Sequence, residues 1–518
     1  MSDQEYRAEA LTGIAPYLPD VLPEALDCAR GISDQEYRAE TLTGLARHFP
    51  QVLPEALDCA RGISDERYRA QAFIGLDPYL PETLLPKALD CIRRIGSEFH
   101  RANALIGIAP HLPDVLPEAL DCARGISNEE YRSNTLIALA PYLSETLLPK
   151  ALDCARGIGH EYHRANALIS LAPHLPEVLP EALDCVRGIG HKYHRAYALI
   201  SLVPHLPETL LPKALDCARG IDHEYYRAKA LISLVPHLPD VLPEALDCAT
   251  GISDEYDRAL ALGALAPYLP DVLPEALDCA RGVANEEYRA KALEYLAPHL
   301  PETLLPKALD CAIGILDEPC RGDALRALAP HLPQVLLPQA LDCAIGISDE
   351  LEGAWSLIAL ADHLSDVLLP QALDCARGMG SQYDRAIVLI NLASHFPQVL
   401  PEALDCARGI PNQEYRAKAL LDLAPHLPDV LPEVLDAAKG IGYEYRRAEV
   451  LQHLIENLTP SVVDFPFWQQ ILYSLASLTR PNFIKTIPQL APLITKFGGI
   501  ESLRETVAAV EDVRRWWR

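Results

Sequence analysis

The tripeptide Leu-Asp-Cys recurs along this 518-residue chain at intervals of 31 or 32 residues. A fourteenth copy reads Leu435-Asp436-Ala437. A fixed period of this length is typical of proteins in which each unit is one supersecondary element stacked on its neighbours. The period therefore outweighs any domain count that length alone would suggest. The cysteines of the motif stand at positions 28, 59, 91, 122, 154, 185, 217, 248, 279, 311, 343, 375 and 406.

Each period predicts two short amphipathic helices. In the first unit, Leu11, Ile14 and Leu18 have the i, i+3 and i+7 spacing of one helical face. The second helix opens on a proline in all 14 units, such as Pro23, which suits the first turn because proline lacks the N–H that would be unpaired there. It ends on glycine in 13 of 14 units, with Arg94 as the exception, and an apolar residue follows, which is the pattern of a Schellman cap.

Two such helices cannot bury their apolar stripes alone, so successive units must stack. We therefore expect an all-α fold, an α-solenoid of about 14 helix-turn-helix repeats of 31 or 32 residues, over residues 1–441. Residues 442–518 are expected to form a final half-repeat and an aromatic-rich helical cap. Because the chain begins directly in a repeat, its first apolar face is expected to be open or to continue an upstream module.

The two spacings differ by one leucine, which stands before the proline that opens the second helix. The residue after that proline differs between the two spacings. Glutamate and lysine alternate strictly there over seven units, which predicts that the array grew by duplication of a two-repeat block. The alternating residues are Glu55, Lys87, Glu118, Lys150, Glu181, Lys213 and Glu244.

The charge balance limits the kinds of partner. Lys and Arg number 45 and Asp and Glu 72, for a formal net charge of −27, which repels nucleic-acid phosphates and anionic membranes. No run of about 18 apolar residues suggests a membrane span, and no basic and apolar leader follows Met1. We therefore expect a cytoplasmic protein with no nucleic-acid or membrane partner, and a protein partner that carries basic patches.

The unit Ser-Asp-x-x-Tyr-Arg-Ala-x-Ala-Leu-x-x-Leu-Ala-Pro-His-Leu-Pro-x-x-Leu-Pro-Glu-Ala-Leu-Asp-Cys-Ala-Arg-Gly-Ile resembles the short helical-hairpin repeats, between HEAT-like and TPR-like, of cyanobacteria and other bacteria. Such arrays form C-terminal sensor arms of STAND-type NTPases, and the tail with Arg480-Pro481-Asn482-Phe483 is similar to the segment that closes them. The resemblance covers nearly the whole chain and implies a recognition or scaffolding module, with an upstream NTPase module as a partner. The chain lacks Gly-x4-Gly-Lys-Ser/Thr, so ATP hydrolysis is not expected.

No cofactor or metal site is predicted. Thirteen of the 14 cysteines share one column, and equivalent positions of stacked helices lie about 9–10 Å apart, too far for a disulfide. They are expected to be small buried packing residues, because a redox site would need a basic neighbour. Five histidines in three successive first helices are expected to form a solvated cluster and not a zinc site. They are His160, His163, His191, His194 and His223.

An arginine begins the first helix in 14 of 15 copies, where a cation opposes the helix dipole and so requires a partner. The favoured partner is the aspartate of the Leu-Asp column, which would form a structural ladder between units. Two alternatives stay open: the guanidinium caps the carbonyl groups that end the preceding helix, or the column binds anions. The first ladder residues are Arg38, Arg69 and Arg101 with Asp27, Asp58 and Asp90.

Specificity would reside in positions without a structural duty. Two residues after the arginine, the residue type varies from unit to unit, and the position lies about 200° around the helix from the core leucine. It should therefore face away from the hairpin interior, where aromatic residues are typical of binding hot spots; drift on a solvated face is the alternative. The candidate partner-binding residues are Asn103, Asn134, Asn166, Tyr197, Lys229, Lys291 and Trp355.

Together these features predict a non-enzymatic protein-interaction scaffold or sensor arm with an extended acidic surface. Two alternatives stay open. A HEAT-like lyase or other ligand-handling enzyme would need a cleft with convergent polar groups. An RNA-binding repeat protein would fit the modular layout but conflicts with the negative charge.

Overall fold

The computed structural model describes residues 3–461 and 463–512, and their side chains from residue 5 to residue 509. Within these residues the chain is helical and contains no strand, so the predicted all-α repeat fold is confirmed. The residues pack into two units. Unit 1 comprises Met1–Gly188 and Gly442–Arg518, and unit 2 comprises Ile189–Ile441. The division at residues 441 and 442 into a repeat array and a cap stays a prediction.

Unit 1 holds the first repeats and the C-terminal segment. Its helices are α1 (Asp3–Ile14), α2 (Leu22–Arg30), α3 (Gln35–Ala46), α4 (Leu53–Gly62), α5 (Glu66–Leu76), α6 (Leu85–Arg93), α7 (Glu98–Ile108), α8 (Leu116–Gly125), α9 (Glu129–Leu139), α10 (Leu148–Arg156), α11 (Glu161–Leu171), α12 (Leu179–Gly188), α29 (Glu444–Glu456), α30 (Phe465–Leu475) and α31 (Arg480–Asp512).

Unit 2 holds the remaining repeats. Its helices are α13 (Lys192–Leu202), α14 (Leu211–Arg219), α15 (Glu224–Leu234), α16 (Leu242–Thr250), α17 (Glu255–Leu265), α18 (Leu273–Gly282), α19 (Glu286–Leu296), α20 (Leu305–Ile313), α21 (Glu318–Leu328), α22 (Leu337–Ile345), α23 (Glu350–Ala361), α24 (Leu369–Gly378), α25 (Gln382–His395), α26 (Leu400–Gly409), α27 (Gln413–Leu423) and α28 (Leu431–Lys439).

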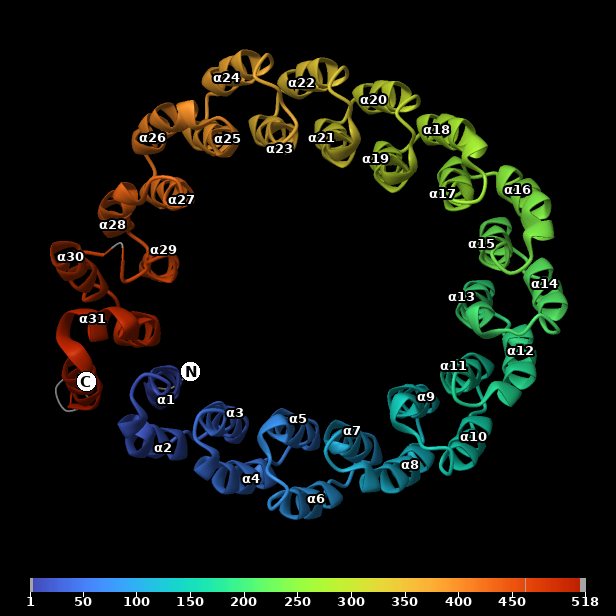
Figure 1. The fold of residues 1–518 in the computed structure, drawn as a ribbon, viewed down its shortest axis with the longest axis horizontal. Helices are drawn as coiled ribbons and strands as arrows, with labels where there is room; N and C mark the ends of the chain where they lie inside the picture. Colours follow the sequence, from blue (N-terminus) through green and yellow to red (C-terminus); the bar gives the residue numbers. More distant parts are fainter. Residues whose placement is uncertain (1–2, 462, 513–518) are drawn as a thin grey trace. The chain divides into compact units, whose positions relative to one another are not determined.

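Each repeat is a pair of antiparallel helices, an odd-numbered first helix and an even-numbered second helix. In unit 2 the first helices form one layer and the second helices another (Figure 1). The core lies between the layers. In α17 and α18, for example, Ala259, Leu262 and Leu265 face Ala276 and Leu277, all at most 1% exposed. The small alanines let the helices approach closely, and each fully buried leucine contributes about 1.5–3 kcal/mol.

The two repeat spacings produce two different turns between the helices. In repeats of the shorter spacing, a 3-10 turn precedes the second helix, at Pro19–Val21, Pro50–Val52, Pro113–Val115, Pro176–Val178, Pro239–Val241, Pro270–Val272, Pro397–Val399 and Pro428–Val430. In five of the six repeats of the longer spacing, the turn extends the first helix, at Asp77–Tyr79, Ala140–Tyr142, Val203–His205, Ala297–His299 and Ala329–His331. The extra leucine therefore moves the turn from one helix to the other.

The predicted Schellman cap is wrong. The glycine that ends the second helix has ordinary right-handed geometry, with φ −77° at Gly31, and Gly499 alone has a positive φ among the described residues. In several repeats this glycine instead makes room for a glutamate side chain of the preceding first helix. A Cβ on Gly282 would lie 2.8 Å from a carboxylate oxygen of Glu255, so the absent side chain leaves room for that carboxylate.

The C-terminal helix α31 turns sharply at Gly499 and forms two arms, residues 480–498 and 500–512. The first arm packs against α1, where a Cβ on Gly13 would lie 2.6 Å from Cβ of Pro488. The ammonium of Lys485 lies 5.1 Å from the ring centre of Tyr6. The expectation of an open first face is therefore wrong, because the chain's own C-terminal segment covers it. No helix in the described ranges is long and apolar enough to cross a membrane.

Candidate interaction surface

The helix-starting arginines bind backbone carbonyl groups and not the predicted aspartates. Arg69 Nε donates to the Ile63 carbonyl at 2.7 Å, and Arg101 Nη1 donates to the Ile95 carbonyl at 2.6 Å. The same contact, to the carbonyl six residues earlier, recurs at nine further arginines: Arg132, Arg164, Arg195, Arg227, Arg258, Arg289, Arg321, Arg385 and Arg416. Capping of the preceding helix, the alternative to the ladder, is therefore the contact present.

Arg38 belongs to the same column but reaches the Arg30 carbonyl at 3.5 Å. The ladder of Arg38, Arg69 and Arg101 with Asp27, Asp58 and Asp90 is therefore wrong for the described side chains. The physical reason is position: the guanidinium lies over unsatisfied carbonyl groups at a helix end, where the dipole is negative and a cation is stabilised.

The second contact of the arginine depends on the repeat spacing. In several shorter repeats Nε reaches a cysteine Sγ, as from Arg101 to Cys122 at 3.0 Å. In three longer repeats Nη1 reaches the glycine carbonyl that ends the next second helix, as from Arg132 to Gly157 at 3.0 Å. The cysteines therefore have the basic neighbour that a redox site would require. Burial nevertheless raises the pKa of the Cys122 thiol and outweighs the effect of Arg101, which favours the protonated, unreactive form.

The aspartate column pairs between repeats with a different partner. Lys87 donates to Asp58 at 2.9 Å, and Lys150 and Lys307 make the same contact with Asp121 and Asp278. Asp27 pairs with Arg30 of its own helix, and Asp90 pairs with Arg94, the residue that follows its helix. The aspartates thus form inter-repeat pairs at some junctions, but the cation comes from the following second helix.

The alternation of glutamate and lysine now has a structural explanation. Where the residue after the proline is glutamate and the preceding second helix ends in arginine, the glutamate accepts from that arginine, as Glu118 does from Arg93 at 2.8 Å. The equivalent pairs are Arg30–Glu55, Arg156–Glu181, Arg219–Glu244, Arg377–Glu402 and Arg408–Glu433. In the longer repeats this residue is lysine or glutamine, and the aspartate of the preceding second helix binds Lys87, Lys150, Lys307 and Gln339. Lengthening of the turn is therefore accompanied by replacement of the carboxylate by a hydrogen-bond donor.

A carboxylate at the start of a first helix also caps the next first helix. Glu129 accepts from the backbone N–H groups of Gly159 at 2.8 Å and His160 at 2.7 Å. These bonds favour the charged form and lower the pKa of Glu129. Glu66, Glu286, Glu318 and Glu350 make the same pair of contacts one repeat further along.

The predicted partner-binding column is partly exposed. Trp355 on α23 is 49% exposed, with Leu351 one turn earlier at 50%, so the two form an apolar patch. Asn134 and Lys291 are exposed, whereas Asn103, Asn166, Tyr197 and Lys229 are half-buried. The column therefore lies at the border of the interface between first helices and does not point wholly into solvent.

Three members of that column lie in a larger cluster on unit 2, which we call the tyrosine–lysine row. Lys229 Nζ lies 3.2 Å from the Tyr197 hydroxyl oxygen, 5.0 Å from the centre of that ring and 5.4 Å from the centre of the Tyr225 ring. Lys291 Nζ lies 5.5 Å from the centre of the Tyr288 ring and 2.6 Å from a Glu287 oxygen. The row comprises Tyr193, Tyr197, Tyr225, Tyr226, Lys229, Tyr256, Tyr288 and Lys291, on α13, α15, α17 and α19.

The rings of the row contact one another across repeats. Tyr193 and Tyr226 meet edge to face at 5.6 Å between ring centres, and the rings of Tyr256 and Tyr288 lie 5.0 Å apart with their planes tilted by 34°. Burial and the nearby carboxylate of Asp257 raise the pKa of Tyr225, so its hydroxyl stays protonated. Tyr193 and Tyr288 remain 41% and 46% exposed. The row thus offers neutral aromatic faces that are held in place by their neighbours.

A second surface lies over the first helices of unit 1. A groove of about 1000 Å³ runs across α1, α3 and α5 and is lined by Tyr37 and Tyr68 together with several carboxylates. Burial and the carboxylates of Asp34 and Asp65 raise the pKa of Glu36. Burial and the carboxylates of Glu9 and Glu40 raise the pKa of Tyr37 to about 12. Both shifts have neighbouring negative charge as a cause, and negative potential favours a cationic partner.

Four of the five histidines predicted to form a solvated cluster pair within their own repeats, and the ring of the fifth, His223, lies 4.7 Å from that of Tyr226. The rings of His160 and His163 lie 4.8 Å apart, and those of His191 and His194 lie 4.7 Å apart. Burial and the neighbouring His160 lower the pKa of His163. Among the described side chains, no three His, Cys, Asp or Glu residues are arranged to hold a metal ion.

Sequence reasoning missed most of the tyrosine–lysine row. The predicted column lies two residues after the arginine of each first helix. Four tyrosines of the row instead stand one or two residues before that arginine: Tyr225, Tyr226, Tyr256 and Tyr288. The high density of aromatic residues just before the arginine in these successive units was the available signal. It also missed the lysine-to-aspartate pairs, which the glutamate and lysine alternation encodes.

The chain was compared with protein-family models, curated protein sequences and solved structures. No protein-family model and no curated protein sequence matches it. Among solved structures it is similar to yeast importin-beta (Kap95p), with 11% identity over 95% of this chain and 80% of that chain and a TM-score of 0.49. It is also similar to the karyopherin Kap121p bound to the extreme C-terminus of Cdc14p, with 13% identity over 98% of this chain and 67% of that chain and a TM-score of 0.39. Importin13 in its cytosolic state gives 9% identity, 98% and 79% coverage and a TM-score of 0.43.

Proposed function

We propose that the chain is a non-enzymatic protein-interaction scaffold that binds a partner with basic patches through its first-helix surface. The observation that carries this proposal is the position of Lys229 over the rings of Tyr197 and Tyr225. Lysine ammonium groups of the chain itself already occupy aromatic faces of the row. The exposed faces of Tyr193 and Tyr288 can receive Lys or Arg side chains of a partner by the same cation–π attraction.

The acidic character of the chain supports the same partner chemistry. The net charge of −27 and the carboxylate-lined groove over α1, α3 and α5 favour approach of a cationic protein surface. The same charge disfavours nucleic acid as a partner. The resemblance of the repeats to bacterial sensor arms supports a cytoplasmic role beside an upstream NTPase module.

The enzyme alternative receives less support. A lyase-type site would need convergent polar groups in a cleft. The unit 1 groove does gather carboxylates, but they lie on a wide, open surface that suits an extended partner better than an enclosed small substrate. The polar groups of the row are already paired with each other.

The proposal is tested by affinity capture with the full chain, followed by quantitative mass spectrometry of the bound proteins. The variant Tyr193→Leu/Tyr288→Leu removes two exposed rings of the row. Tyr17→Leu/Tyr142→Leu removes two rings of similar exposure, 47% and 44%, outside it. We expect basic proteins to be lost with the first variant and retained with the second. Equal capture by both variants would contradict the proposal.

A further inference from the structure

The groove over α1, α3 and α5 matches one segment of this chain in charge and in length. Residues 513–518 lie beyond the described residues and read Val-Arg-Arg-Trp-Trp-Arg, with three guanidinium groups and two indole rings. The groove has a volume of about 1000 Å³ and is lined by four carboxylates and two tyrosine rings. Arginine side chains are attracted both to carboxylates and to aromatic faces.

The groove has room for another chain because three successive repeats carry glycine at one position. Gly13, Gly44 and Gly75 line it, and each stands six residues after the repeat arginine. Later repeats place larger side chains at this position, such as Tyr295 and Asp422. Even a Cβ on Gly75 would lie 3.9 Å from its nearest neighbour. A second backbone can therefore approach the helices closely here.

The negative charge of the groove is concentrated on the first half of α3. Glu36 and Glu40 stand one helical turn apart, where like charges repel each other. Neither forms an ion pair with any described side chain. Burial and neighbouring carboxylates raise the pKa of Glu36, so a cation nearby would stabilise its charged form. Arg47 also lines the groove, but it follows the opposite end of α3 and lies over the Tyr79 ring.

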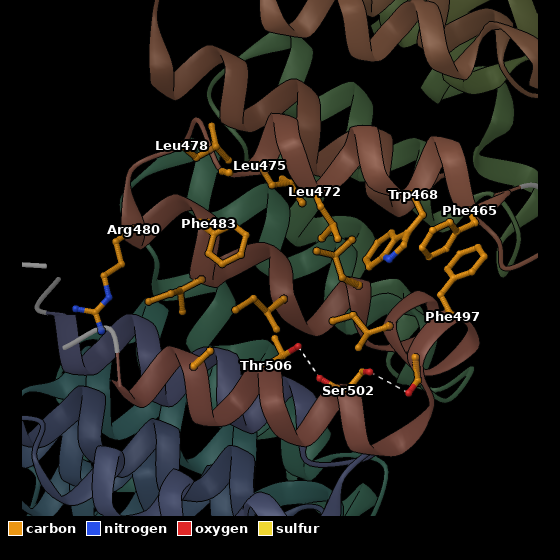
Figure 2. Close-up of a pocket in the computed structure, with 17 residues that line it drawn as sticks. Phe465, Trp468, Leu472, Leu475, Leu478, Arg480, Phe483, Phe497, Ser502 and Thr506 are labelled. Atoms are coloured by element: carbon orange, nitrogen blue, oxygen red, sulfur yellow. Dashed lines mark hydrogen bonds between the residues drawn. The ribbon is translucent and has the colours of Figure 1, made fainter. Parts of the chain in front are cut away.

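The described part of the chain ends beside α1. The first arm of α31 packs along α1, with Lys485 at Tyr6 and Pro488 at Gly13. Gly499 adopts φ 71° and ψ −177°, a region open essentially to glycine alone, and the chain turns back there. The two arms then run antiparallel and line one apolar cavity together (Figure 2). The second arm therefore returns toward the N-terminal end of α1.

The six residues that follow can reach the groove. Asp512, the last residue of α31, and Lys485 stand about equally far along the chain from Gly499, so the second arm ends about level with Tyr6. Tyr37 on α3 is the equivalent of Tyr6 one repeat later and lines the groove. Six extended residues span about 20 Å, which is about two spacings between packed helices. The segment is thus long enough to cross α1 and lie on the first half of α3.

We propose that residues 513–518 occupy the groove over α1, α3 and α5 of their own chain. The segment lies extended across α1 and α3, with guanidinium groups at Glu36 and Glu40 and indole rings against Tyr37 and Tyr68. A basic partner then gains the groove only when it displaces the segment, so the groove is autoinhibited. This consequence rests on the proposed function, whereas the docking of the segment does not.

The test is fluorescence anisotropy of a labelled peptide with the sequence of residues 513–518. It is titrated with the full chain and with a chain ending at Asp512, which keeps every described residue. We expect saturable binding to the shortened chain and at least about tenfold weaker binding to the full chain, because its own segment competes. No saturable binding to the shortened chain, or equal affinity for both proteins, would overturn the proposal.

Charge variants locate the binding in the groove. In the shortened chain, Glu36→Gln/Glu40→Gln should weaken peptide binding at least about tenfold. Glu82→Gln/Glu145→Gln, at exposed positions outside the groove, should leave it unchanged. A peptide with glutamine in place of its three arginines cannot affect the folding of the chain and should not bind. Equal affinity of the two double variants, or undiminished binding of the neutral peptide, would contradict docking at Glu36 and Glu40.

Sedimentation equilibrium of the full chain distinguishes docking within one chain from docking on a second copy. We expect no dimer that depends on Glu36 and Glu40. Dimers that form with rising concentration and are abolished by Glu36→Gln/Glu40→Gln would assign the groove to the segment of a second copy and contradict the proposal. None of these measurements involves Tyr193 or Tyr288, so their failure is distinct from failure of the proposed function.

Discussion

The ammonium of Lys229 lies 3.2 Å from the hydroxyl oxygen of Tyr197, a residue one repeat earlier in the chain. The same ammonium lies over the Tyr197 ring, so the lysine binds both the polar and the aromatic part of one side chain. Two positions of the variable column are therefore in contact. The variable column of first helices is a connected surface in this part of unit 2.

The arginine caps should contribute measurably to the stability of the array. Arg132→Ala removes bonds to the Ile126 and Gly157 carbonyls and leaves both unpaired. We expect the free energy of unfolding to fall by about 1–3 kcal/mol, as for hydrogen bonds to charged groups. Urea denaturation measures the change. Arg124→Ala, which removes an exposed arginine of the neighbouring α8, is the control and should cost less than about 1 kcal/mol.

The carboxylate caps predict a specific pH dependence. Backbone N–H groups hold the pKa of Glu129, Glu286, Glu318 and Glu350 below the ordinary value of 4.5. Their contribution to the free energy of unfolding is therefore fully present above pH 4.5 and is lost as the pH falls through the lower folded values.

Replacement of all four by glutamine should lower the midpoint of thermal unfolding at pH 7, and the difference from the unmodified chain should shrink as the pH falls below 4.5. Circular dichroism at a series of pH values measures this difference. Glu302→Gln, at an exposed loop position, serves as the control. A constant difference between the quadruple variant and the unmodified chain across the pH series would refute the capping role.

The exposed ion pairs between second helices should be weak individually. Arg93 and Glu118 are 54% and 30% exposed, and such pairs typically contribute about 0.2–1 kcal/mol. A double-mutant cycle with Arg93→Ala and Glu118→Ala should give a coupling energy in that range, reduced at high salt. A coupling energy of several kcal/mol that is insensitive to salt would mean that the pair acts as a buried one.

The contact between α1 and α31 predicts opposite effects at two equivalent glycines. Gly13 and Gly75 each stand six residues after the repeat arginine. A Cβ at Gly13 would lie 2.6 Å from Pro488, whereas a Cβ at Gly75 would make ordinary contact at 3.9 Å. Gly13→Ala should destabilise unit 1, and Gly75→Ala should stabilise it by about 0.5–1 kcal/mol. Stabilisation by both changes would show that α31 does not pack on α1 in solution.

The sequence was sufficient to predict the helices but not the side-chain partners. Periodic apolar residues and Pro23-type starts specify each helix because they depend on local geometry. Arg101 and Asp90 were expected to pair from charge alone, yet Arg101 binds the Ile95 carbonyl. Which partner a long side chain reaches depends on turn geometry, and one inserted leucine changes that geometry. The packing of α31 on α1 joins segments more than 450 residues apart, for which no local pattern exists.

The tyrosine–lysine row shows the same limit at the candidate site. Its members come from four helices, and Tyr225 and Tyr288 stand outside the column that variation singled out. Their proximity to Lys229 and Lys291 depends on how first helices stack. Stacking distances follow from packing between repeats and not from any single repeat.

Site-specific photo-crosslinking tests the central claim most directly. A benzoylphenylalanine residue is placed at position 288, in the tyrosine–lysine row, or at position 142, an exposed tyrosine position outside it. The full chain is then irradiated in cells. We expect crosslinked adducts with a basic protein from position 288 and none from position 142. Equal adducts from both positions, or none from position 288, would contradict it.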